Sequence, residues 1–186
     1  MDPFAGKPRP VVGEARELAG DLLGGLGDRW RHTVAVAARA RELAVTVPAE
    51  DRDLLVAAAW LHDIGYAEPV ADTGFHPLDG ARHLDRLGWP RRISALVAHH
   101  SGAGLVAEAV GLGDELGAYP REDGPVADAL TYADQTVDHR GRRVTVPERL
   151  ADVLRRHGPD SANARVHHLR GPRLLAVAER VERRLG

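Results

Sequence analysis

Apolar residues recur along most of this chain at intervals of three and four, the spacing of one face of an α-helix. A clear example follows Asp28, which is predicted to cap a helix whose apolar positions are Val34, Ala37, Ala38, Leu43 and Ala44. Proline and glycine residues divide the rest of the sequence into further segments of this kind. Further helices are expected over residues 11–23, 49–62, 77–88, 90–100 and 105–112, from residue 125, from residue 147, and over 172–185. Residues 66–75 and 113–124 are expected to be loops.

The alternation of apolar and polar residues that is typical of β-strands occurs only in the short segment 144–146. Aromatic residues make up only 4% of the chain, so alanine, leucine and valine must build the core, which favours close helix–helix packing. A length of 186 residues fits one domain of ordinary size. We therefore predict an all-α fold, a compact single-domain helical bundle over residues 11–186, preceded by a disordered lead over residues 1–10.

Charge and composition exclude several kinds of protein. The 25 basic and 27 acidic residues give a net charge of -2, which argues against nucleic acid as a partner. The absence of cysteine excludes disulfides, thiolate metal sites and cysteine nucleophiles. Residues 1–10 lack the apolar core of a signal peptide, and no apolar run is long enough to span a membrane. We expect a cytoplasmic protein with no membrane partner.

Histidines and aspartates on or beside the predicted helices form a candidate metal-binding set. Its members are His32, His62, Asp63, His76, His99, His100 and Asp134. Imidazole and carboxylate suit a divalent transition metal such as Fe, Mn, Zn, Ni or Co. Ligands so far apart in sequence converge only if several helices surround one point. One or two ions per chain are expected.

The order of His32, the adjacent pair His62-Asp63, and Asp134 resembles the HD-domain superfamily of metal-dependent phosphohydrolases. The string 61–65, which reads Leu-His-Asp-Ile-Gly, resembles the HDIG variant of its signature. The resemblance covers about residues 30–137 and leaves the helices of residues 147–186 outside it. It implies that these four residues bind one metal and that His62 and Asp63 act in catalysis.

The segments around His76 and around His99-His100 resemble those that family members with two metals use for the second ion. Asp63 would then bridge, because each of its oxygens can face one cation. Between the adjacent histidines, which point apart on a helix, the spacing favours His99 slightly. His76 has an alternative role as a cap of the helix that starts at Pro77.

A site that cleaves phosphate also needs fixed positive charge. Arg140 and Arg143 follow Asp134 closely, and Arg91 begins the helix that leads to the paired histidines. Tyr66, just beyond the His-Asp pair, is a candidate to orient a substrate oxygen. For the arginines the alternative is a solvated helix end, and for Tyr66 it is a packing role.

The resemblance implies a metal-dependent phosphohydrolase that uses a metal-activated water to cleave a phosphomonoester, phosphodiester or phosphoanhydride, foremost of a nucleotide. Two branches are similar: the symmetric dinucleoside tetraphosphate hydrolases and the HD-GYP cyclic-dinucleotide phosphodiesterases. Ser101 and Tyr66 depart from the glutamate and lysine that the second branch has at these places. Two alternatives stay open, a di-iron oxygenase of the same superfamily and a non-catalytic metal or nucleotide sensor. A homo-oligomer is also open, since the last helix can cover either the core or a partner subunit.

Overall fold

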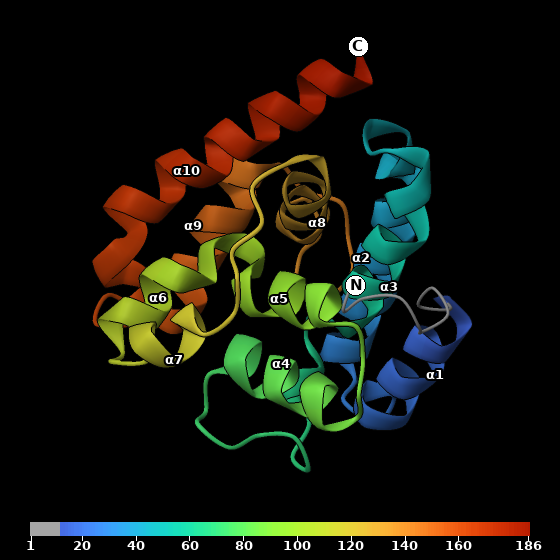
Figure 1. The fold of residues 1–186 in the computed structure, drawn as a ribbon. Helices are drawn as coiled ribbons and strands as arrows, with labels where there is room; N and C mark the ends of the chain where they lie inside the picture. The colour runs from blue at the N-terminus through green and yellow to red at the C-terminus, as the bar shows by residue number, and fades with distance from the viewer. Residues whose placement is uncertain (1–11) are drawn as a thin grey trace.

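Two buried helices form the centre of the fold in the computed structural model, which describes residues 12–186. They are α3 (Arg52–Leu61) and α8 (Pro125–Gln135). The helices around them are α1 (Val12–Leu23), α2 (Asp28–Leu43), α4 (His76–Arg86), α5 (Arg91–His99), α6 (Ala103–Ala109), α7 (Gly113–Gly117), α9 (Val146–His157) and α10 (Ala162–Leu185). Short 3-10 turns are η1 (Ala44–Thr46), η2 (Ala49–Asp51), η3 (Ile64–Tyr66) and η4 (His100–Gly102). Figure 1 shows this arrangement, with α10 along one edge of the molecule.

The predicted all-α bundle is confirmed. Residues 12–186 contain no strand, and segment 144–146 is not one, because the only β pairing in this part of the chain is an isolated bridge between Val137 and Arg143. The predicted lead over residues 1–10 lies outside the described residues. No helix of the described chain has the length and apolar character needed to cross a membrane.

The core forms because α3 is covered on all sides. Its residues from Leu54 to Leu61 are buried, and α1, α2, α5 and α8 pack around it. Three successive alanines, residues 57–59, let neighbouring helices approach closely. On the far side of α8, α10 buries Leu174, Ala178 and Val181, so the last helix covers the core of its own domain.

The apolar pattern located the buried face of α2 only in part and chose the wrong cap. Ala37 and Leu43 are buried as predicted, but Val34 and Ala38 are exposed, and the buried face also carries Val36 and Ala40. These two residues follow His32 by four and eight positions, so the same face points the histidine inward. Asp28 is the first residue of the helix rather than its cap, and its side chain pairs with Arg31.

Two further boundaries differ from the sequence prediction. The expected loop over residues 113–124 contains the short helix α7. The last helix begins at Ala162 and continues through Pro172, where the sequence predicted a start. A proline inside a helix removes one backbone hydrogen bond, and the burial of Val166 and Leu174 on either side offsets that loss.

Candidate metal centre

The structure brings six of the seven candidate ligands to one point. They come from the second turn of α2, the end of α3, the start of α4, the residue after α5, and the end of α8: His32, His62, Asp63, His76, His100 and Asp134. The η3 turn packs against α4, which places the end of α3 beside the start of α4. The predicted convergence of several helices on one point therefore holds for these six side chains.

The first group of ligand atoms consists of His32, His62 and Asp63, whose donor atoms all lie within 4.8 Å of one another. Oδ2 of Asp63 is 3.3 Å from Nε2 of His62 and 3.7 Å from Nε2 of His32. Asp134 adds Oδ1 at 3.0 Å from Nε2 of His32 and 4.0 Å from Nε2 of His62. Two imidazoles and two carboxylates thus face one small volume.

The second group consists of Asp63, His76 and His100. Oδ1 of Asp63 is 3.3 Å from Nε2 of His76 and 4.0 Å from Nε2 of His100, and the two Nε2 atoms are 3.3 Å apart. Asp63 therefore turns one oxygen toward each group, which is the arrangement of a carboxylate able to bridge two cations.

Backbone carbonyls orient three of the imidazoles for ligation. The Nδ1 atoms of His32, His62 and His100 lie 2.8, 2.8 and 2.6 Å from the carbonyl oxygens of Asp138, Ala59 and Val97, respectively. Because a carbonyl only accepts, each Nδ1 donates its proton to the backbone, and each Nε2 is left as the nitrogen available to a metal once it is unprotonated. Nε2 of His62 is buried without a hydrogen-bond partner in residues 12–186, so the donor set fits a metal ion.

The charges of the cluster also favour a cation. Burial by itself would raise the pKa of Asp63 and of Asp134, but neighbouring histidines and arginines hold both well below the usual range. Burial lowers the pKa of His76 and, helped by His62 and His76, lowers that of His100 to about 3. The second group thus presents ionised carboxylate and neutral imidazoles, the protonation states that metal binding requires.

Metal binding at the first group is expected to weaken as the pH falls. Burial alone would lower the pKa of His62, but the Asp63 carboxylate outweighs it and raises this pKa above its ordinary value of 6.5. Proton and metal compete for Nε2, so the affinity should fall by about tenfold for each pH unit below the raised pKa. Calorimetric titration with Mn²⁺ in two buffers of different ionisation enthalpy measures both the affinity and the proton released. An affinity independent of pH, with no proton release, would contradict this.

The preference for His99 over His100 was wrong. Nε2 of His99 lies 2.8 Å from the carbonyl oxygen of Tyr119, away from the cluster. Helix α5 ends at His99, and His100 takes an extended backbone with φ -60° and ψ 149°. This change of direction turns the second ring, not the first, toward Asp63.

The paired histidines give a sharp test of the second group. His100→Ala is expected to weaken binding of one metal ion by more than about 100-fold, since even indirect ligand partners contribute about 10–100-fold. His99→Ala, one residue away, should leave metal content unchanged because its ring faces Tyr119. Metal analysis of both variants after dialysis against chelator-free buffer makes the comparison, and equal losses would disprove the assignment of His100.

His76 belongs to the cluster rather than to a helix cap. The cap position of α4 is Phe75, and no side chain makes a capping hydrogen bond there. The His76 ring stacks on Tyr66, with ring centroids 4.0 Å apart and planes 19° apart. Tyr66 thus lies beside the candidate ligands, as expected, and lines the cavity that opens at them.

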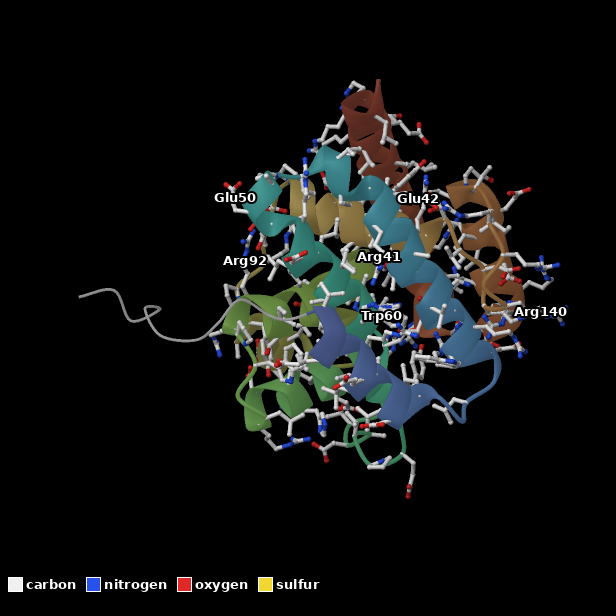
Figure 2. All side chains as sticks on the ribbon, turned by 90° about the vertical axis from the view of Figure 1, so that its right-hand side faces the viewer. Arg41, Glu42, Glu50, Trp60, Arg92 and Arg140 are labelled. Atoms are coloured by element: carbon white, nitrogen blue, oxygen red, sulfur yellow. The ribbon has the colours of Figure 1, made fainter. Side chains whose placement is uncertain are left out.

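That cavity has a volume of about 280 Å³, and four of the six clustered residues line it: Asp63, His76, His100 and Asp134. None of the three arginines predicted to bind substrate lines it. Arg143 pairs with Glu42 on the outside of α2, and Arg91 donates to the carbonyl of Ala118 at 2.7 Å. Arg140 is exposed at the outer edge of the molecule (Figure 2).

The error on these arginines has a simple cause. The chain turns away from the cluster soon after Asp134, because the Asp138 carboxylate accepts hydrogen bonds from the backbone N–H groups of Arg140 and Arg142, at 2.9 Å each. Proximity in sequence to a ligand therefore did not place the following arginines in the cavity.

Other positive side chains line the cavity instead, and sequence reasoning missed them. They are Arg29, Arg149, Arg156 and Arg170. Arg29 donates to Oδ2 of Asp63 and lies over the Tyr66 ring at 3.9 Å from its centroid. Its position three residues before His32, on the same helical face, was a usable signal. The others come from α9 and α10, far from any recognisable motif.

Comparison with protein families gives one match. The family model described as HD domain matches residues 29–137, more than half of the chain, and this span contains all six clustered residues. No curated protein matches the chain, and no solved structure matches it.

Proposed function

Because this chain belongs to the HD-domain family, we propose that it is a metal-dependent phosphohydrolase acting on a small phosphorylated substrate, foremost a nucleotide. The observation that carries the proposal is the pair of ligand groups that share Asp63 at the floor of a cavity. The arginines around that cavity support an anionic substrate, since guanidinium groups match phosphate oxygens in charge and geometry.

The cofactor is one or two divalent ions of Fe, Mn, Zn, Ni or Co, held by the six clustered residues. When bound, such ions polarise a phosphoryl group and activate a water molecule. Asp63 is the residue on which both groups depend, and His62 contacts one of its oxygens at 3.3 Å. Substitution of Asp63 or His62 should therefore lower the rate of hydrolysis most.

Two side chains beside Asp63 are our candidates for binding substrate. The Arg29 guanidinium is held against Asp63 and over Tyr66, where it can donate to a phosphoryl oxygen. Burial, with the Asp63 charge, raises the pKa of Tyr66 to about 12. Tyr66 therefore stays protonated at neutral pH and donates a hydrogen bond rather than acting as a base. Phe75 and Pro77 add an apolar wall that supports a substrate with a nucleoside part.

The proposal is tested with protein purified without metal and then loaded separately with each of the five ions. We expect hydrolysis of at least one of p-nitrophenyl phosphate, bis-p-nitrophenyl phosphate or a nucleotide panel, measured as release of p-nitrophenol or of phosphate, and none after chelation. Metal binding without hydrolysis of any of these compounds would favour a non-catalytic binding protein. Consumption of O₂ by the iron-loaded protein would favour the oxygenase.

A further inference from the structure

The lining of the cavity contains more positively charged than negatively charged side chains. Four arginines line it against two carboxylates. Arg29 lies beside Asp63, to which it donates a hydrogen bond, and Arg149, Arg156 and Arg170 lie on the wall formed by α9 and α10. Since this excess lies in a confined space, it favours a ligand with several negative charges.

Arg149 is buried without the hydrogen bonds that a buried guanidinium normally makes. Its side chain is only 8% exposed, yet Nε and Nη1 have no hydrogen-bond partner within residues 12–186. The nearest carboxylate oxygens, of Asp134 and Asp152, are 3.8 and 3.7 Å away, beyond hydrogen-bond reach. Charged donors are costly to leave unsatisfied, so this guanidinium is suited to an acceptor that enters the cavity.

Arg170 lies on the same wall of the cavity, and a hydrogen bond holds its side chain in place. Its Nε donates to the carbonyl oxygen of Ser101 at 2.9 Å, while its terminal nitrogens make no hydrogen bond to the described part of the chain. Burial, together with the positive charge of Arg149, lowers the pKa of Arg170 despite the attraction of Asp134. Two buried guanidiniums that repel each other are stabilised by an anion placed between them.

Asp134, itself a candidate metal ligand, lies near both Arg149 and His32 of the first group. Its Oδ1 is 3.0 Å from Nε2 of His32 and 3.8 Å from Nη2 of Arg149. Its Oδ2 accepts a hydrogen bond from the hydroxyl of Ser101, the residue whose carbonyl holds Arg170. With a metal held by the first group, positive charge would therefore lie on both sides of a single carboxylate. A ligand with two anionic groups joined by one bridging atom can reach both sides, whereas a phosphomonoester carries only one such group.

We propose that Arg149 and Arg170 form an anion subsite that holds the leaving phosphate of a phosphoanhydride, so that the substrate carries at least two phosphates in anhydride linkage. This inference rests on the proposed phosphohydrolase function. The water oxygen forms a bond to the phosphorus beside Asp63, and the bond from that phosphorus to the bridging oxygen breaks. The electron pair of the broken bond stays on the leaving phosphate, where the two guanidiniums stabilise it. The two protons of the water pass to the product phosphates and solvent.

Binding of inorganic phosphate and of imidodiphosphate, a diphosphate analogue that resists hydrolysis, tests the subsite directly. Calorimetry is done with the metal-free and the Mn²⁺-loaded protein. Wild type should bind imidodiphosphate more tightly than phosphate. Arg149→Met and Arg170→Met should each weaken imidodiphosphate binding by about 10–100-fold, the range for lost charge-assisted hydrogen bonds. In the Mn²⁺-loaded protein they should affect phosphate much less, because the ions can bind a single phosphate without the subsite.

Arg173→Met is the matched control, because Arg173 lies on the same helix as Arg170 but is exposed and lines a different cavity. It should leave both affinities unchanged. Arg149→Lys keeps the charge but loses the planar fork, and it is expected to lose part of the imidodiphosphate affinity. It serves in place of Arg149→Met if circular dichroism shows that the methionine variant does not fold.

Kinetics then separates this inference from the proposed function. The two methionine variants should lower kcat/KM for ADP far more than for p-nitrophenyl phosphate. Equal losses on both substrates would mean that the arginines contact the transferred phosphoryl group, and unchanged imidodiphosphate affinity would mean that there is no subsite; either result overturns the proposal. If wild type hydrolyses none of the compounds used to test the proposed function, the phosphohydrolase function fails. Arginine-dependent imidodiphosphate binding would then identify a diphosphate-binding site without a leaving-group role.

Discussion

Asp63→Asn is expected to abolish most metal binding at both groups and to lower phosphohydrolase activity by about 10³-fold or more. One carboxylate oxygen of Asp63 faces His32 and His62, and the other faces His76 and His100. A single substitution therefore removes a candidate ligand from each group. An asparagine amide has one oxygen and no charge, so it binds the ions poorly. Loss of a metal ion removes several kcal/mol of transition-state stabilisation. Elemental analysis and turnover of the best substrate, measured on the same preparation, check the two effects together.

Asp53→Asn is the control for this experiment. Asp53 lies in the first turn of the same helix, α3, and is exposed. It should retain wild-type metal content and activity. If Asp63→Asn folds and keeps its full metal content, the shared carboxylate does not hold the ions, and the proposed centre is wrong.

Gly65→Ala is expected to destabilise the fold by about 3 kcal/mol or more and to displace His76. A Cβ built on Gly65 would lie 2.0 Å from the carbonyl oxygen of His76, a distance that only a backbone movement can relieve. Overpacking of this kind typically costs about 1–3 kcal/mol, and more when backbone rather than a flexible side chain must move. Because Asp63 and His76 lie on the two segments that would separate, metal affinity should fall together with stability.

Gly104→Ala provides the matched comparison for denaturant unfolding. Gly104 is inside α6, and no atom lies within 4 Å of the position that its Cβ would take. Alanine there should be neutral or stabilising by up to about 1 kcal/mol, since glycine is the poorer helix former. If Gly65→Ala unfolds at the same denaturant concentration as Gly104→Ala, the close approach of η3 to α4 does not constrain the site.

Local features of the sequence determined the helices, the class of fold and most of the candidate ligands. Proline and glycine mark where helices such as α4, α5 and α8 begin, because their effect on the backbone acts within one or two residues. The adjacent pair His62-Asp63 after an apolar run is also a local feature. The residue types of His32 and Asp134 can likewise be read directly from the sequence. The chemistry of imidazole and carboxylate then points to a transition metal wherever these groups meet.

Only the tertiary structure decided which of two adjacent histidines joins the centre and which arginines face the cavity. His99 and His100 are equivalent in the sequence, and the end of α5 between them sends their rings in different directions. Arg149 and Arg170 lie outside the segment that carries the family signature and reach the cavity because α9 and α10 fold back over it. Such contacts depend on the packing of whole helices, whose direction is set by many distant side chains, and no local pattern records them.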